Sequence, residues 1–292
     1  MVLIQTKMCV LVTILILLSQ LCSAELVVSH NISKKKFLEG DFDYELKLLI
    51  LGLEYTKDEY GDYRIEPIRD DMSYIRRIER MSYNHYTNFI TAMPYQDNLS
   101  EDANLVYAPF PVFLGVLGYR TCFTSAESNK RLASVKNTKD LLTFTHGQVR
   151  GELDVEILKN NGFIVKESSS YMSLFRMVAV NRFDLFCRNP EDALAEYNYH
   201  QKVPNFIYNR DIAIHYPMPY FFYGHVSDRK LIERINKGLV RAFNSGSVVK
   251  LWKQHFQENI DFIDLKNRKL YPFENHLLEH LDDSYTQYVY AP

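Results

Sequence analysis

The sequence predicts an α/β protein built from two lobes. Short apolar segments alternate with amphipathic helical segments, which is the order expected for a sheet covered by helices. The alternation occurs twice, before and after an apolar stretch that ends near residue 118. The length of 292 residues suffices for two domains of roughly 130 to 150 residues each. We therefore expect two Rossmann-like lobes with mixed, mostly parallel sheets and a cleft between them, where small-molecule sites commonly form.

The composition excludes two classes of protein. Apolar residues make up 47% of the chain and charged residues 24%, which is ordinary for a globular protein and argues against long disorder. The chain has 34 Lys and Arg against 36 Asp and Glu, so its formal net charge is −2. Nucleic-acid binding would require a clustered basic excess. We therefore expect no nucleic-acid partner.

Residues 1–24 have the three regions of a secretory signal peptide. Lys7 precedes an apolar run at 8–18, and small residues follow up to Ala24. The run is too short for a comfortable transmembrane span. Lipid attachment at Cys22 is the alternative, although Leu21 does not fit the position before a lipidated cysteine. We expect cleavage after Ala24 and an exported, soluble mature protein.

The first lobe is expected to contain three strands and two helices before residue 118. Length and leucine content favour a helix over a strand at 43–56. Residues 63–68 alternate with period two, as a strand does. Ile75, Ile78 and Met81 share one face of a helix at 73–81. The two remaining strands are expected at 25–29 and 88–93.

The second lobe repeats this order, and two long helices follow it. The helix expected at 152–160 ends at Asn161-Gly162, a suitable C-terminal cap. Two helices are expected at 228–244 and 247–256, separated at Gly246. After residue 265 the chain becomes polar and aperiodic, so we expect a surface tail. Further extended segments are expected at 115–124, 141–145, 163–166, 182–188 and 212–215, and helices at 171–180 and 190–197.

Five short motifs share their order and spacing with one family. They are GVLGYR at 115–120, VKNTKDL at 135–141, LFRM at 174–177, RFDLFCR at 182–188 and YPMP at 216–219. With them the chain resembles the bacterial extracellular solute-binding proteins of family 3, and within these a proteobacterial branch. The resemblance covers about residues 41–270. It implies the type II periplasmic-binding-protein fold, with lobe 1 at 25–118 plus 213–268, lobe 2 at 119–212 and a tail at 269–292.

The resemblance also implies a function. A monomer in the periplasm would capture a small, polar, amino-acid-like metabolite between its lobes, without a cofactor, for an ABC permease or a sensor domain. Two alternatives stay open. Where the branch carries a second Gly and Trp-Pro-Asp, this chain has Val149 and then Glu152, Leu153 and Asp154, which favours a degenerate relative that binds another protein. An enzyme on the same fold would need an acid–base pair such as Glu152 and Asp154.

Six residues are candidates for ligand binding. Arg188 ends a strand, and the carboxyl ends of strands in open α/β sheets face the ligand crevice, so its guanidinium would hold a ligand carboxylate. Its alternative is a salt bridge. Asp154 either pairs with a ligand ammonium or favours the dipole of its helix. Gln148 offers an amide donor and acceptor on the preceding turn. The resemblance adds Thr91, on the ligand-facing strand of lobe 1, together with Arg150 and Tyr216.

The cysteines and histidines do not predict a metal site. Cys122 and Cys187 remain after cleavage; a single bridge between them is possible, and the sequence does not decide it. Neither has a second ligand at zinc spacing. The string His276-x-x-Glu279-His280 has the form found in inverted zinc peptidases, but it lies in the polar tail, so we expect an exposed helix end. Lys34–Lys36 are expected to lie in a solvent-exposed loop.

The first prediction concerns the mature N-terminus. N-terminal sequencing of the exported protein is expected to start at Glu25, because Ala24 closes the signal-peptide pattern. A lipid-modified Cys22 at the N-terminus would contradict both the cleavage site and the free, unanchored form.

Overall fold

The computed structural model describes residues 25–32, 44–70 and 72–289. The expected signal peptide and Lys34–Lys36 lie outside the described residues. The apolar segments of lobe 1 form a five-stranded sheet in the order β2-β1-β3-β11-β4. Its strands are β1 (Leu26–Asn31), β2 (Tyr63–Ile68), β3 (Phe89–Pro94), β4 (Leu105–Ala108) and β11 (Tyr220–His225). β1 runs parallel to β2 and β3, whereas β11 lies between β3 and β4 and runs antiparallel to both.

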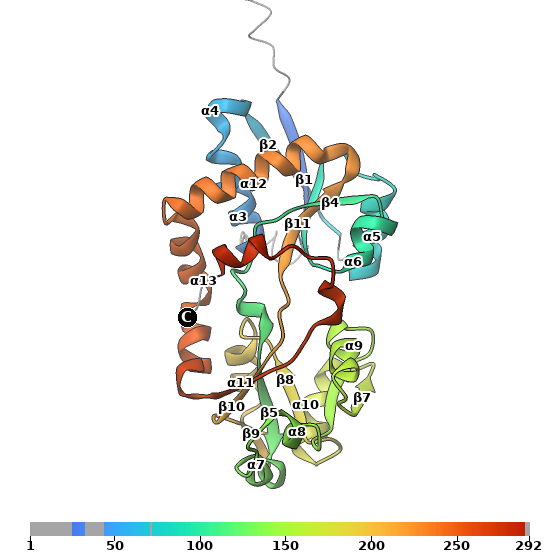
Figure 1. The fold of residues 1–292 in the computed structure, drawn as a ribbon, viewed down its shortest axis with the longest axis vertical. Coiled ribbons are helices and arrows are strands. Elements are labelled where there is room, and N and C mark those ends of the chain that lie inside the picture. Colours follow the sequence, from blue (N-terminus) through green and yellow to red (C-terminus); the bar gives the residue numbers. More distant parts are fainter. Residues whose placement is uncertain (1–24, 33–43, 71, 290–292) are drawn as a thin grey trace, which may run out of the picture.

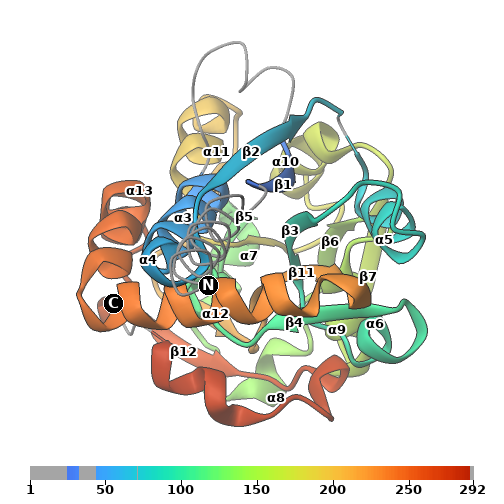
Figure 2. The ribbon, with the colours of Figure 1, turned by 90° about the horizontal axis from the view of Figure 1, so that it is seen from above.

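Helices cover this sheet, and α12 and α13 are the longest of them (Figure 1). Trp252 of α13 is completely buried, and its indole N–H donates to the carbonyl of Phe113 at 3.2 Å. α12 crosses α3 so closely that Gly238 faces the backbone of Gly52. Figure 2 shows α12 lying across the top of lobe 1. The helices of lobe 1 are α3 (Tyr44–Glu54), α4 (Lys57–Tyr60), α5 (Tyr74–Ser82), α6 (Asp97–Asp102), α12 (Arg229–Asn244) and α13 (Ser247–Ile263).

Lobe 2 contains a second mixed sheet in the order β12-β10-β5-β8-β6-β7, with β9 also paired to β5. β5 runs antiparallel to β8, β9 and β10. Cys122 of β5 lies directly opposite Cys187 of β8, and the two form a disulfide, which answers the question that the sequence left open. The strands are β5 (Tyr119–Ser125), β6 (His146–Val149), β7 (Val165–Ser168), β8 (Leu185–Arg188), β9 (Phe206–Tyr208), β10 (Ile212–His215) and β12 (Lys269–Pro272).

Five helices surround the second sheet. Leu174, Phe175 and Val178 of α10 are fully buried against it, as the apolar face of this segment predicts. The helices are α7 (Ala126–Leu132), α8 (Thr138–Leu141), α9 (Leu153–Asn160), α10 (Tyr171–Ala179) and α11 (Ala193–His200). The predicted α/β fold of two lobes with mixed sheets is confirmed. Among the described residues, no helix combines the length and apolar character needed to cross a bilayer.

The prediction of a strand at 141–145 is wrong. Asn137 and Asp140 form a reciprocal capping box, which starts the short helix α8. Leu141 and Phe144 are buried, but they reach the core from this helix and from the turn after it. The strand of this region, β6, begins only at His146. A second difference concerns α13, which continues to Ile263 instead of ending at residue 256.

Two strands lie outside the lobes expected for them. β10 pairs with β5 in the second sheet, so the return to lobe 1 begins only after His215. β12 pairs in parallel with β10, so residues 269–272, expected in a surface tail, extend the second sheet. The chain thus passes between the lobes at 109–118, the first crossing, and at 216–219, the second crossing. It passes to the second sheet once more at 264–268, between α13 and β12. The residues after β12, 273–289, are called the strap below; they contain the turns η4 (His276–Leu278) and η5 (Asp283–Tyr288).

The second prediction tests the contact between α3 and α12. A methyl group on Gly238 would lie 1.8 Å from the carbonyl oxygen of Gly52, which is rigid helix backbone. We expect Gly238→Ala to lower the free energy of unfolding by about 1–3 kcal/mol or more, measured by denaturant unfolding. Gly52→Ala is the matched control, because its methyl group would meet the Leu239 side chain at 3.1 Å and a side chain can shift. Equal stability of Gly238→Ala and wild type would contradict this packing.

Candidate functional site

A cavity of about 240 Å³ lies between the lobes. This volume is slightly below the range of about 300–1,000 Å³ typical of ligand pockets, so it suits a small molecule. Its wall combines residues of lobe 1, of the two crossings and of lobe 2. The lining residues are Tyr74, Arg77, Pro94, Leu117, Arg120, Gly151, Glu152, Leu153, Asp154, Arg188, Asn189, Met218 and Tyr220.

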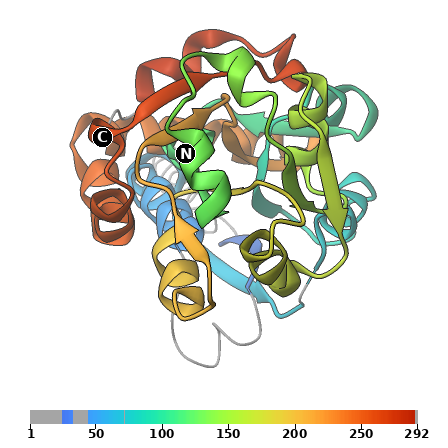
Figure 3. The same cartoon turned by 90° about the horizontal axis from the view of Figure 1, so that it is seen from below.

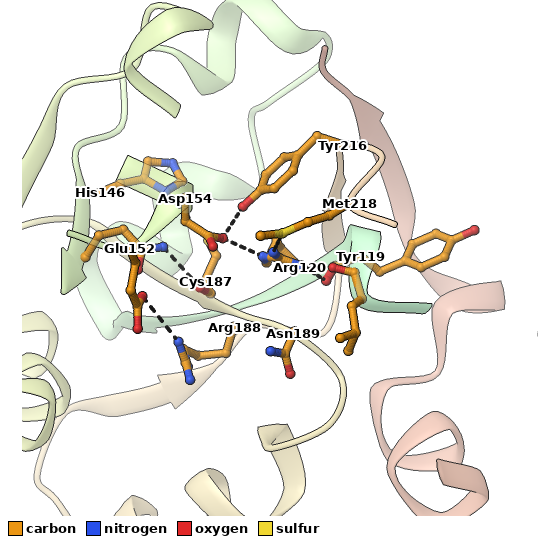
Figure 4. Close-up of polar contacts among 12 residues, drawn as sticks. Tyr119, Arg120, His146, Glu152, Asp154, Cys187, Arg188, Asn189, Tyr216 and Met218 are labelled. Atoms are coloured by element: carbon orange, nitrogen blue, oxygen red, sulfur yellow. Dashed lines mark hydrogen bonds and ion pairs between the residues drawn. The ribbon is translucent and has the colours of Figure 1, made fainter. Parts of the chain in front are cut away.

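A buried ion pair forms one side of the cavity (Figure 4). Arg120 lies at the start of β5, and its Nε donates to Oδ1 of Asp154 at 2.7 Å. Asp154 stands in the first turn of α9, where a carboxylate is also favoured by the helix dipole. The hydroxyl of Tyr216 donates to the same carboxylate oxygen, and the Arg120 guanidinium lies 4.7 Å from the centre of the Tyr216 ring. The three side chains therefore form one closed network.

Most of the rest of the Arg120 guanidinium is also occupied. Its Nη1 donates to the carbonyl oxygens of Leu117 and Tyr119, the latter at 2.9 Å, and its Nη2 lies 2.9 Å from the sulfur of Met218. These partners come from the first crossing, from β5 and from the second crossing. Four of the five N–H groups of Arg120 are thus engaged, and the residue ties both crossings together.

The same network determines the charge of Asp154. Burial alone would raise the pKa of the Asp154 carboxyl, but the Arg120 guanidinium and the hydrogen bonds from Arg120 and Tyr216 outweigh it and lower the pKa. Asp154 is thus a carboxylate already neutralised by a buried partner. It lines the cavity, but its charge is already used in the buried ion pair with Arg120.

Arg188 lines the cavity at the end of β8, and it is held by carboxylates on one side. Its Nε donates to Oε1 of Glu196 at 2.9 Å, whereas its terminal nitrogens lie 3.7 Å from Asp192 and 3.9 Å from Glu152. The guanidinium also lies 5.1 Å from the centre of the Tyr171 ring. The salt bridge, one of the two interpretations of Arg188, is therefore present, while its terminal nitrogens are only loosely engaged.

Two further charged groups line the cavity, one from each lobe. Partial burial raises the pKa of the Glu152 carboxyl, and its ion pair with Arg188 is long. Arg77 on α5 has no ion pair within the described part of the chain, and its buried Nε has no hydrogen-bond partner there. Of the cavity's charged side chains, Arg77 is therefore the most available to a bound anion.

The other four predicted residues do not line the cavity. Tyr216 is buried in the network described above. Gln148 is buried in β6, where its Nε2 donates weakly to the carbonyl of Cys187 at 3.4 Å and its Oε1 has no partner among the described residues. Thr91 is buried in the middle of β3. Arg150 is largely exposed and lies 3.9 Å from Glu167.

Of the six predicted ligand-binding residues, only Arg188 and Asp154 line the cavity. Its other charged and amide side chains, which were not predicted as ligand contacts, are Arg77, Arg120, Glu152 and Asn189. Arg120 was visible as the end of the GVLGYR motif, which was a signal that it matters. Asn189 directly follows the strand end at Arg188, so extending the strand-end argument by one residue would have found it. Nothing in the sequence singles out Arg77, because it is one of several polar residues of an amphipathic helix.

The structure gives no metal centre in the described ranges, since no three His, Cys, Asp or Glu side chains gather there in a metal-binding group. The zinc-peptidase-like string is split between two partners. His276 lies 3.1 Å from Glu156 of α9, and His280 lies 3.5 Å from Asp97 of α6. The two histidines thus contact different lobes, and the string forms a short turn where we expected a helix end.

The third prediction tests the buried pair. Asp154→Asn leaves the Arg120 guanidinium buried without its anion, so we expect the free energy of unfolding at pH 7 to fall by about 3–5 kcal/mol. Because the Asp154 pKa is lower in the folded protein, its contribution to stability is complete above the unfolded value of about 3.9 and is lost as the pH falls through the lower native value. The difference between wild type and variant should therefore shrink below about pH 4 in denaturant titrations.

The control for this prediction is Glu167→Gln. Glu167 also lies 2.6 Å from a cation, Lys159, but at the surface, so its loss should leave the unfolding midpoint within error of wild type. Equal effects of the two substitutions would mean that the Arg120–Asp154 pair is no more important than a surface ion pair.

Comparison with known proteins shows similarity of fold, whereas the similarity of sequence is low. No protein-family model and no curated protein match the chain. Among solved structures, the ligand-binding core of GluR0 in complex with L-glutamate is 12% identical, with 80% of this chain and 100% of that one covered and a TM-score of 0.56. A histidine kinase sensor domain with similarity to periplasmic binding proteins is 12% identical, over 80% and 96% of the two chains, with a TM-score of 0.54.

A third structure comes from work on glutathione import via GshT and the cystine ABC importer TcyBC of Streptococcus mutans. It is 15% identical, covers 80% of this chain and 95% of that one, and has a TM-score of 0.53. At these identities the likeness concerns the fold. The resemblance inferred from the short motifs is confirmed at that level: the chain has the two-lobed α/β fold of type II periplasmic binding proteins.

Proposed function

We propose that this protein is an exported solute-binding protein that captures a small metabolite carrying a carboxylate between its two lobes. The observation that carries the proposal is the cavity between the lobes, which is lined by Arg77 of lobe 1 and by Arg188, Asn189 and Glu152 of lobe 2. A ligand in this cavity contacts both lobes at once. Sites between domains with a few convergent polar groups are typical of small-molecule binding.

The two arginines are the proposed carboxylate ligands. A guanidinium presents donors in a fork that matches the two oxygens of a carboxylate. Arg77 lines the cavity, and its buried Nε has no hydrogen-bond partner among the described residues. Arg188 has one strong bond, from Nε to Glu196, which orients its terminal nitrogens toward the remaining partners. Glu152, whose pKa is raised by partial burial, offers an acceptor for a ligand N–H group, which suits an amino-acid-like molecule.

Binding at such a site would be coupled to lobe movement. A ligand that contacts both lobes binds best when they are close, so it shifts the population toward the closed form. The first and second crossings connect the lobes at the cavity, and Leu117 and Met218 in them line it. The backbone of these two segments is therefore the proposed hinge.

The fold and the signal-peptide pattern together favour a role in the periplasm, as a monomer that hands its ligand to a membrane partner. Two partner classes fit, because structures of the same fold include a sensor domain and a protein studied with an ABC importer. An enzyme on this fold is disfavoured. Asp154 is neutralised by Arg120, so of the carboxylate pair only Glu152 is left and a two-residue acid–base arrangement is lacking.

The fourth prediction tests Arg77 as a ligand contact. A thermal-shift screen of amino acids, short peptides and organic acids should yield a ligand with a carboxylate. Arg77→Gln should then weaken its binding roughly 30-fold to several thousand-fold, since losing one partner of a desolvated charge pair costs about 2–5 kcal/mol. The unfolding temperature without ligand should not change, because Arg77 makes no ion pair in the described structure.

Arg76→Gln is the matched control, because Arg76 is the neighbouring residue on α5 and pairs with Asp70 at 3.3 Å outside the cavity. It should bind the ligand like wild type. If Arg77→Gln also binds like wild type, Arg77 is not a ligand contact. If no compound in the screen stabilises the wild type, and a protein partner is captured instead, the binding-protein proposal fails in favour of a protein-interaction role.

A further inference from the structure

The strap, residues 273–289, is anchored first on lobe 2. Asn161, which caps the end of α9, donates from Nδ2 to the carbonyl of Glu274 at 2.7 Å, and its Oδ1 accepts from the Glu274 N–H at 3.2 Å. Phe273 packs against Phe163, with ring centres 4.9 Å apart. His276 then lies 3.1 Å from Glu156. The beginning of the strap is thus fixed to α9 and to the residues that follow it.

A few residues later the strap is anchored on lobe 1. The carboxylate of Asp97 on α6 accepts the backbone N–H groups of Glu279 at 2.9 Å and of His280 at 3.0 Å. Tyr285 is 9% exposed, and its ring centre lies 5.7 Å from that of Phe221 in β11. This second anchor therefore combines two charge-assisted hydrogen bonds with apolar packing on the first sheet.

The strap also touches both crossings. Asn275 donates from Nδ2 to the carbonyl of Pro217 in the second crossing at 2.9 Å. At its other end, Val289 lies against Gly115 of the first crossing, where a methyl group on the glycine would come within 2.8 Å of Val289 Cγ1. Figures 2 and 3 show this red segment on the side of the molecule opposite α11, whose Glu196 holds Arg188.

We propose that the strap is an intramolecular tie that limits the movement of lobe 2 against lobe 1. The anchors at His276 and Glu279 are three residues apart and are joined by the turn η4. A 3₁₀ turn advances about 2 Å per residue and an extended chain about 3.3–3.6 Å, so the segment spans about 6 Å and can stretch to about 10 Å. α6 and α9 can therefore separate by only about 4 Å before one anchor breaks.

This tie goes beyond ligand capture and does not depend on it. The two crossings connect the lobes at the cavity, and the end of α13 contacts lobe 2 near α11, where the centre of the Phe262 ring lies 5.4 Å from that of Tyr197. The strap adds a restraint on the opposite side of the molecule. Any larger movement must first release the Asp97 bonds or the contact of His276 with Glu156, after which the Asn161 bonds still hold the beginning of the strap. The strap thus limits how far the lobes can separate on its side of the cavity, whichever molecule binds there.

The experiment measures the distance between the lobes directly. Spin labels are placed on Tyr83→Cys in lobe 1 and Val180→Cys in lobe 2, two exposed positions outside the strap, and the distance distribution is measured by pulsed electron resonance. The full-length labelled protein is compared with a chain ending at Pro272 and with the double variant Asp97→Ala, Asn161→Ala. We expect both to broaden the distribution or shift its mean by more than about 4 Å, the slack of the anchored segment.

Asp282→Ala is the matched control, because Asp282 is a strap carboxylate that accepts the N–H of Ser284 within the strap and contacts neither anchor among the described residues. Its distance distribution should match that of the full-length protein. Hydrogen exchange of the Glu279 and His280 amides reports whether the strap is released. Unchanged distances in the double variant with these amides exchanging freely would overturn the proposal, and so would amides that stay protected without Asp97 and Asn161. If the chain ending at Pro272 does not fold, the distance distribution of the double variant alone tests the proposal. No ligand is used, so the result stands apart from the ligand screen.

Discussion

The cleft depends on one enclosed guanidinium. Arg120 lies where the chain enters the second sheet, and it contacts the first crossing, the second crossing and the first turn of α9. A buried charge of this kind is tolerated only when its anion and its hydrogen-bond acceptors are in place. The two crossings and α9 must therefore be assembled together, and the position of the cavity wall follows from that requirement.

Local sequence pattern was sufficient where an element buries one face on its own sheet. The strand at 63–68 and the helix at 228–244 agree with β2 and α12 within a residue, because periodicity records burial. The pattern failed at 141–145, where buried apolar residues occur in a capped turn and helix that mimic a strand. It also failed at β12, whose four residues gain their order only by pairing with β10.

The site was predicted less completely, because its contacts join distant residues. The strand-end argument found Arg188, but the carboxylate that holds it stands on the next helix, and no pattern links the two. Asp154 has the helix-start position that the sequence shows, yet its partner is 34 residues earlier. Thr91 lies on its expected strand but inside the protein, since the side of a short buried strand that faces a cleft is not encoded in its apolar run. Gln148 was expected on a turn and instead lies buried in β6.

The interleaved topology has a consequence for the order in which the molecule can be completed during folding. β11 lies between β3 and β4, although more than a hundred residues separate it from β4 along the chain. Until residues 220–225 arrive, β3 and β4 each have an unpaired edge of the kind that promotes aggregation. All residues of lobe 2 except β12 precede this strand. The later lobe in sequence is thus available to fold first, and it must do so while the sheet of lobe 1 is still open along its middle.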